Sequence, residues 1–498
     1  EVDPFARECP VTRRRRKEND MATSNDIEKA ARAKGTRLMF QRFLAQTETM
    51  ICRYRDYVPV ALTLVLILVA LWGYRGSRSW RLGPPLGAVM GHDFRAVLSA
   101  ARAIEAGENL YAHALAFGRS PNFEEFLTWE TAAYVYSPLV AVLARPLTRM
   151  QPEVALKLWS GFNLALIVGS ALVAVRAFTS PGILRSATRF PFILTLFFVH
   201  GPTQIDLLLV QLDILVLFLL LSTYLLYRMG YHNGAGVPLA FAIAIKPTVG
   251  TMLLFFAWKS RWRILVITVV TVALLTALGF CVVGWARLPD YLEVIRLWAS
   301  GPILVFPHNQ SVKGFVLRAF TSNIYNQPLY IVPWLARAIP VVVGLLAIGG
   351  WLVSTSRSDN RAESANGVEY GLTLTTLLML SPLVSDIHFV WVLMPLSALL
   401  LAMIDDLRGM KSLLLLVICF SVALYLGYPA VQDKTYVGYG ALLYRGQLVE
   451  RSKVLCTGAY LYGLAALDIC LVMYLNLQRI SKRRLEPPCP DETRVANN

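Results

Sequence analysis

Five short polar clusters stand out in a chain whose remaining sequence is strongly apolar. In the first, Gly91-His92-Asp93-Phe94, an aspartate directly follows a histidine where a helical pattern begins. Its carboxylate could take a proton from an acceptor hydroxyl and so act as a general base. Asp is equally a favoured helix N-cap, and the two roles can coexist at Asp93.

A lone lysine marks the second cluster. Lys246, followed by Pro247, lies within an otherwise apolar stretch, where a lysine costs about 2.5–3.5 kcal/mol on insertion scales. Such a cation is a candidate ligand for a lipid phosphate. The alternatives are snorkelling to the interface or pairing with an intramembrane acid such as Asp206 or Asp213.

The third cluster lies in the loop 287–327, where polar donors precede two cations. The donors are His308, Asn309 and Gln310, and the cations are Lys313 and Arg318. Together they could hold a sugar or a phosphate. A solvated loop that caps a short helix is the alternative.

Two further clusters lie next to apolar stretches. Tyr136 belongs to Tyr-Val-Tyr-Ser-Pro, and aromatic residues are common at membrane interfaces. His388, in Ser-Asp-Ile-His, could bind substrate or shift the pKa of a nearby carboxylate, or it is an ordinary turn residue. Because His92, His308 and His388 lack the spacing of a metal site, we predict neither a metal nor a cofactor.

Membrane helices must position these groups. The chain has 498 residues, is 56% hydrophobic and 16% charged, and has a mean hydropathy of +0.51. This composition excludes an ordinary soluble enzyme, a disordered chain and a disulfide-built domain. Twelve apolar stretches predict an all-α, polytopic bundle of about 10–13 transmembrane helices. The seven scattered cysteines predict neither a disulfide nor a zinc site.

Charge predicts the orientation. Residues 1–55 hold 13 Lys and Arg against 8 Asp and Glu, and 479–498 hold 5 against 3. The net charge of +16 therefore indicates cytoplasmic flanks and not nucleic-acid binding. We expect a basic cytoplasmic segment 1–55, a transmembrane domain 56–478 and a cytoplasmic tail 479–498. Residues 1–20 precede the first methionine, Met21, and are a candidate translation artefact without a signal peptide.

One conflict remains in this scheme. With twelve crossings, Arg185, Arg189 and Arg228 fall on the outer side, against the positive-inside rule. Two re-entrant segments, one broken at Lys246-Pro247, would leave ten crossings and move some of these arginines.

The outer loops have a pattern of their own. One helical face is apolar and Gly107 ends the run, which predicts an amphipathic helix at the outer membrane surface. The positions on this face are Phe94, Val97, Leu98, Ala101 and Ile104. A second such helix is predicted from Ser311 to Phe320.

In their order along the chain, these segments resemble glycosyltransferase family 87, which has the GT-C fold. The residues that carry the resemblance are His-Asp-Phe, ARAIEAGENLY, YVYSPL, GPTQIDLLLVQLDILVLFLL, LAFAIAIKPTVGTMLLFFAWKSRWR, HNQSVKGFVLRAF and SDIHFVWVLMPL, within 75–404. The chain departs from the family pattern in Arg95-Ala96-Val97 after the aspartate, in Ser137 for a proline, and in Gln204-Ile205-Asp206 for a Gln-Asn pair.

The resemblance implies transfer of a mannose-like hexose or a pentose from a polyprenyl-phosphate donor to a lipid or glycan acceptor, with inversion, at the outer face of the cell membrane. Asp93 would be the base. Lys246, Arg318 and Lys313 would meet the phosphate. The remaining implied ligands of sugar or acceptor are His92, Tyr136, Gln204, His308, Asn309, Gln310 and His388. A polytopic transporter or flippase of lipid-linked sugars is the alternative, although such folds commonly carry a repeat.

Overall fold

The structure is a computed structural model that describes residues 37–76 (except 38, 40, 44 and 52), 91–119, 133–180, 182–357, 363–427 and 450–485. The chain divides into two compact units, Glu1–Arg55 with Asp406–Leu415, and Asp56–Asp405 with Leu416–Asn498. All candidate site residues belong to the second, larger unit. The fold of this unit is what positions the site.

Helices make up the described chain, which contains no strand and a single isolated β-bridge between Asn309 and Ser385. The predicted all-α bundle is therefore confirmed. The main helices are α2 (Val58–Gly76), α5 (His92–Ala106), α6 (Ala112–Arg119), α8 (Pro138–Thr148), α9 (Pro152–Phe178), α10 (Ile183–Val199), α11 (Gly201–Leu209), α12 (Asp213–Arg228), α13 (His232–Ile245), η2 (Pro247–Met252), α14 (Leu253–Trp258), α15 (Trp262–Val283), α16 (Leu288–Ser300), α17 (Val312–Phe320), α18 (Pro333–Ser354), α19 (Glu363–Leu380), η5 (Asp386–Val392), α20 (Leu393–Asp405), α21 (Met410–Gly427) and α24 (Ala459–Leu485).

Several of these helices can cross a bilayer. In the described ranges, seven are long and apolar enough, and the bent pair α10–α11 makes eight if it counts as one span. The seven are α2, α9, α15, α18, η5 with α20, α21 and α24. Three apolar segments of 10–17 residues, α8, α13 and η2 with α14, are too short for this criterion. These three short segments account for part of the difference from the expected 10–13 transmembrane helices.

The apolar stretch near 235–257 is not one continuous helix but turns back on itself. The rings of Phe255 and Phe256 in α14 contact Tyr227, whose ring also contacts His232 at the start of α13. The segment therefore returns to the end of the unit from which it began. Lys246 lies at the turn of this re-entrant hairpin, between α13 and η2, as the predicted break requires.

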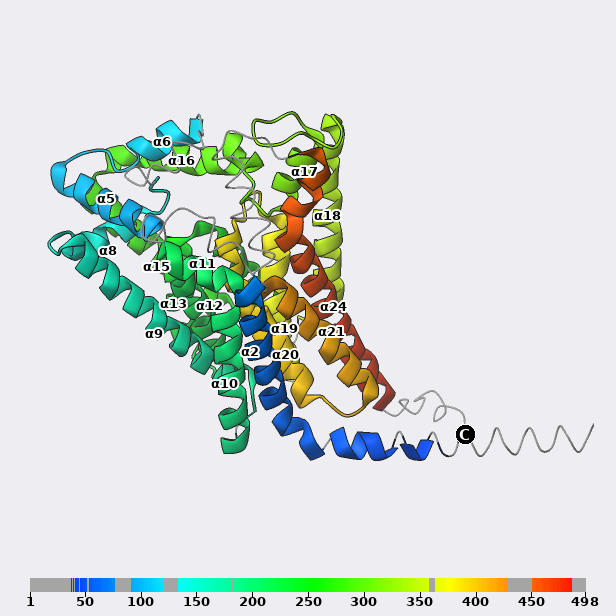
Figure 1. Cartoon of the computed structure of the whole chain (residues 1–498). Coiled ribbons are helices and arrows are strands. Elements are labelled where there is room, and N and C mark those ends of the chain that lie inside the picture. Colours follow the sequence, from blue (N-terminus) through cyan, green and yellow to red (C-terminus); the bar gives the residue numbers. More distant parts are fainter. Residues whose placement is uncertain are drawn as a thin grey trace, which may run out of the picture. The chain divides into compact units, whose positions relative to one another are not determined.

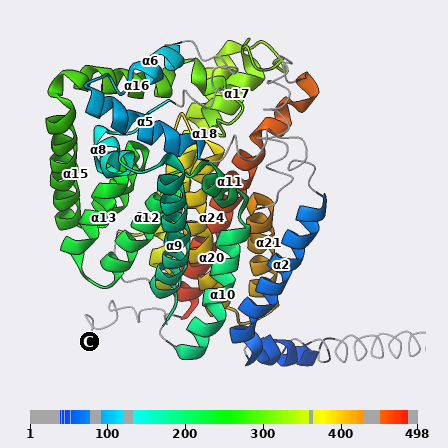
Figure 2. The ribbon, with the colours of Figure 1, turned by 60° about the vertical axis from the view of Figure 1, so that its left-hand side comes forward.

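Short helices gather at one end of the larger unit (Figures 1 and 2), where α5 contacts α8, and α6 contacts α16. With 11 residues, α8 is about 16 Å long and cannot span a hydrocarbon core of about 30 Å. The predicted helix after Gly91 is confirmed as α5, and it ends at Gly107 with φ +72°. Its apolar face packs on Ala155 and Val210 and is buried inside the protein, so the expectation that this face lies on the membrane surface is wrong.

Basic residues mark the opposite end. Arg185 and Arg189 lie 3.8 and 3.7 Å from Asp56, and Arg189 also pairs with Asp405. Arg228 donates to the carbonyl of Ala177, at the end of α9. All three arginines thus lie at the end of the unit where α2 begins and α20 ends, which removes the conflict found in the twelve-crossing scheme.

Candidate functional site

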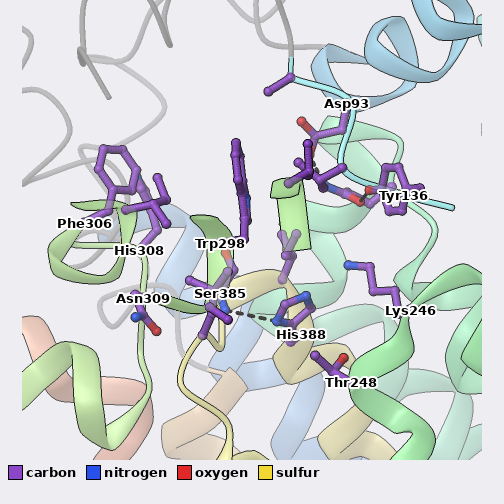
Figure 3. Close-up of a pocket in the computed structure, with 18 of the residues that line it drawn as sticks. Asp93, Tyr136, Lys246, Thr248, Trp298, Phe306, His308, Asn309, Ser385 and His388 are labelled. Atoms are coloured by element: carbon purple, nitrogen blue, oxygen red, sulfur yellow. Dashed lines mark hydrogen bonds between the residues drawn. The ribbon is translucent and has the colours of Figure 1, made fainter. Parts of the chain in front are cut away.

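A cavity of about 340 Å³ lies at the end of the unit that carries α5 and α16, and both helices contribute to its lining. Segments far apart in the sequence form its wall, including the start of α5, the break between α11 and α12, the turn of the re-entrant hairpin, α16 and η5. Seven predicted site residues line it: His92, Asp93, Tyr136, Lys246, His308, Asn309 and His388. In Figure 3, Asp93, Tyr136 and Lys246 follow one side, His308 and Asn309 the other, and His388 lies between them.

Asp93 lies in the first turn of α5, with 22% of its side chain exposed. The N-cap is Gly91, at φ +76°, and in the described structure no side chain caps this helix, so the alternative that Asp93 is the N-cap is wrong. Two neighbours hold its carboxylate instead. His92 Nδ1 lies 2.8 Å from Oδ1, and Gln211 Nε2 donates to Oδ2.

Gln211 is the residue that sequence reasoning missed. Its side-chain oxygen accepts a 2.5 Å hydrogen bond from the hydroxyl of Tyr136, so its amide links Tyr136 to Asp93. Gln204, chosen instead, donates to the carbonyl of Phe198 and is not among the residues described as lining the cavity. The sequence did offer one signal for Gln211, because it is a polar amide in an apolar run, two residues before Asp213.

Lys246 lines the same side of the cavity as Asp93 and Tyr136 and is 8% exposed. Its Nζ lies 2.7 Å from Oδ2 of Asp213, so the predicted alternative of pairing with an intramembrane aspartate is realised. The same atom lies 5.8 Å from the ring centroids of Tyr136 and Trp391. Lys246 is thus both half of a buried ion pair and a wall of the cavity.

Two histidines and an acid line other parts of the cavity. His308 Nδ1 lies 3.2 Å from Oδ2 of Asp386, whose other oxygen accepts from the Ser385 hydroxyl at 2.8 Å. His388 Nδ1 accepts from the Ser385 N–H at 3.0 Å, and its ring stacks on Trp391. Because Nδ1 accepts, a neutral His388 carries its proton on Nε2. Asp386 was part of the predicted cluster but was not selected as a site residue.

Asn309 lines the cavity, yet its amide is already occupied. Nδ2 donates to the carbonyls of Leu304 and Pro382 at 2.8 and 3.1 Å. Oδ1 accepts from the N–H groups of Ser311 and Val384 at 3.1 and 3.0 Å. The side chain therefore joins the loop before α17 to the loop after α19, which leaves it little capacity to bind a sugar.

Three other predicted ligands, Gln310, Lys313 and Arg318, are also absent from the described lining. The buried Arg318 donates to the carbonyls of Phe306 and Asn309 at 2.9 and 2.8 Å and to the Thr457 hydroxyl at 3.1 Å. Gln310 donates to the carbonyls of Pro307 and Thr457. Arg318 and Gln310 therefore hold the loop that presents His308.

An apolar wall completes the cavity. Val294, Ile295 and Trp298 of α16 line it together with Phe117 of α6 and Ile303. The cavity thus offers acids, imidazoles and one lysine on some sides and hydrocarbon on another. This division suits an amphiphile whose polar group reaches Asp93 and Lys246.

The family model described as glycosyltransferase family 87 matches residues 134–382, which is half of the 498 residues. The match includes Tyr136, Gln211, Lys246 and His308, whereas Asp93 precedes it and His388 follows it. None of the curated proteins matches this sequence.

Proposed function

We propose that this chain, which belongs to glycosyltransferase family 87 and is a membrane glycosyltransferase, moves a sugar from a polyprenyl phosphate to a hydroxyl of a lipid or glycan acceptor. The sugar is a mannose-like hexose or a pentose. The observation that carries this proposal is that one cavity contains a carboxylate held by two donors, Asp93, and a buried lysine, Lys246. Family membership favours a transferase over the transporter alternative.

The reaction begins at Asp93. Its carboxylate takes the proton of the acceptor hydroxyl, a contribution of about 10²–10⁴ in rate for a positioned base. The acceptor oxygen forms a bond to the anomeric carbon while the bond from that carbon to the phosphate oxygen breaks on the opposite face. The anomeric centre is inverted, the proton stays on Asp93, and the polyprenyl phosphate leaves with the electron pair.

Lys246 meets the charge that develops on the departing phosphate. An ammonium group has three N–H donors, and Asp213 accepts from one of them. The remaining two can bind phosphate oxygens without breaking the ion pair. In a low-dielectric site such a preorganised cation stabilises the transition state more than it would in water.

His92, Tyr136, His308 and His388 are the proposed contacts of the sugar and the acceptor. Asp386 holds His308, and Ser385 fixes the His388 proton on Nε2, so each ring presents a defined hydrogen-bonding atom. The apolar wall at Ile295 and Trp298 is the proposed contact of the polyprenyl chain.

The cavity opens on the outer side of the cell membrane in this proposal, and both termini are cytoplasmic. The support is the end of the unit that carries Arg185, Arg189 and Arg228, because basic residues favour the cytoplasmic side. The cavity lies at the other end, with α5 and α16.

The experiment is transfer of radiolabelled sugar from polyprenyl-phosphomannose, polyprenyl-phosphoglucose and polyprenyl-phosphoarabinose to a membrane glycolipid extract, in proteoliposomes. We expect transfer from one donor, and loss of about 10²-fold or more with Asp93→Asn. Asp290→Asn is the matched control, because Asp290 pairs with Asn109 and Arg287 outside the described lining. Wild-type turnover by Asp93→Asn would reject the assignment of Asp93 as the base. If none of the three donors supports transfer, the proposed donor class is wrong.

A further inference from the structure

We infer that Gln211 is the positioning residue of the base: its amide holds the Asp93 carboxylate in one orientation, and Tyr136 fixes the orientation of the amide. The inference rests on the proposed role of Asp93. It assigns a function to Gln211, which need not touch the sugar, and a second function to Tyr136, besides its proposed contact with the sugar or the acceptor. It also assigns a function to the helix break between α11 and α12.

The hydrogen bonds define which way the amide points. An ionised carboxylate only accepts hydrogen bonds, so Nε2 of Gln211 must face Asp93. The amide oxygen then faces Tyr136 and accepts its hydroxyl proton at 2.5 Å. Burial raises the pKa of Tyr136 well above its ordinary value, so this hydroxyl keeps its proton. Gln211 is 5% exposed, which leaves the amide no space to turn over into solvent.

The backbone before Gln211 is strained. Val210 has φ +56° and ψ +52°, in the left-handed region. This conformation is rare for a β-branched residue and is energetically unfavourable. Such strain persists only where the surroundings over-determine it, and it is concentrated at functional sites. Here it ends α11 one residue before Gln211.

Two contacts hold the strained turn against the start of α5, and a third holds it against α9. The N–H of Gly91 donates to the carbonyl of Leu208 at 2.8 Å, and Phe94 packs in one apolar cluster with Val210. On the other side, Nδ2 of Asn163 donates to the carbonyl of Gln211 at 3.1 Å. The start of α5 and the α11–α12 break are therefore fixed together. The hydrogen bond from the Gln211 amide to Asp93 is part of this junction.

For catalysis, these contacts fix the orientation of the Asp93 carboxylate. His92 holds one carboxylate oxygen and Gln211 the other, so the carboxylate plane cannot rotate freely. A base must lie within hydrogen-bond reach of the proton that it takes. Without Gln211 the carboxylate keeps a single donor, and the fraction of time it faces the acceptor falls.

The test measures kcat, donor KM and the pH–rate profile of Gln211→Leu and Gln211→Glu in proteoliposomes with the radiolabelled polyprenyl-phosphate sugar that the wild type accepts. We expect kcat to fall about 10–100-fold in Gln211→Leu, as small misplacements of a catalytic group do, with KM within about threefold. Gln478→Leu, on α24, is the matched control.

Gln211→Glu adds a second measurement, the pH–rate profile, which should not change if Gln211 has only a structural role. Two adjacent carboxylates cannot both ionise easily, so the acidic limb of the profile should move by about one pH unit to higher pH. The other titratable groups around Asp93 are His92 and Tyr136, with Asp206, Asp213 and Lys246 deeper. These surrounding groups are the same in both Gln211 variants. A difference between the pH–rate profiles of the two variants therefore comes from the added carboxylate, and the profile of Gln211→Glu remains informative if Gln211→Leu folds poorly.

Tyr136→Phe should lower kcat in the same direction, by about 3–10-fold, with Tyr231→Phe as its exposed control. Wild-type kcat and an unmoved pH profile in both Gln211 variants would overturn the positioning role while leaving Asp93 as the base. Wild-type turnover by Asp93→Asn would instead overturn the proposed function on which this inference depends.

Discussion

Lys246 and Asp213 form a buried ion pair, with Nζ 2.7 Å from Oδ2, that joins the turn of the re-entrant hairpin to the first residue of α12. Asp213 is fully buried. The pair offsets the cost of a buried cation, and it fixes the ammonium group at the cavity wall. One lysine therefore serves both the packing of the hairpin and the proposed binding of phosphate.

Removing only one partner of this pair should be damaging. Lys246→Met leaves the Asp213 carboxylate buried without its cation, which typically destabilises a protein by about 3–5 kcal/mol. We expect a clear fall in the thermal unfolding temperature of the detergent-solubilised protein, together with loss of transfer activity.

The double variant Lys246→Met/Asp213→Leu separates stability from activity. Replacement of a buried pair by apolar residues is often neutral or stabilising, so the unfolding temperature should recover toward that of the wild type. Transfer should not recover, because no cation remains at the cavity wall. A stable and active double variant would remove Lys246 from the proposed chemistry.

Asn309 gives a second prediction, on folding and not on substrate affinity. Asn309→Ala removes four hydrogen bonds to the main chain, and each buried group left unsatisfied costs about 1–3 kcal/mol. We expect the unfolding temperature to fall, while donor KM measured well below that temperature stays within about threefold. The exposed Asn233→Ala is the control for both measurements. A large rise in KM without loss of stability would restore Asn309 as a sugar ligand.

The polar clusters of the sequence predicted four candidate residues, Asp93, Lys246, His308 and His388. Lys246 was recognised because a cation within an apolar stretch is costly, and the other three because they lie in short polar motifs. All four line one cavity. The helix α5 was also predictable, because its apolar period and Gly107 are local features.

The choice between Gln204 and Gln211 could not be predicted in the same way. Both amides lie in one apolar segment, and which of them faces the cavity depends on the left-handed turn at Val210. No glycine or asparagine marks that turn in the sequence. Arg318 presents the opposite case, because its partners are carbonyls and a hydroxyl brought together only by the tertiary fold. A charge in a segment predicted as a loop does not disclose such partners.

The proposed orientation gives a final prediction, because Arg185, Arg189 and Arg228 lie at one end of the larger unit and the cavity lies at the other. Ser300 is exposed at the end of α16, on the cavity side, and Met229 is 48% exposed after α12, beside Arg228. In a background without the seven native cysteines, Ser300→Cys should react with a membrane-impermeant maleimide added to intact cells. Met229→Cys should react only after permeabilisation. Since basic residues are retained on the cytoplasmic side, the reverse labelling pattern would contradict both the orientation and an extracytoplasmic active site.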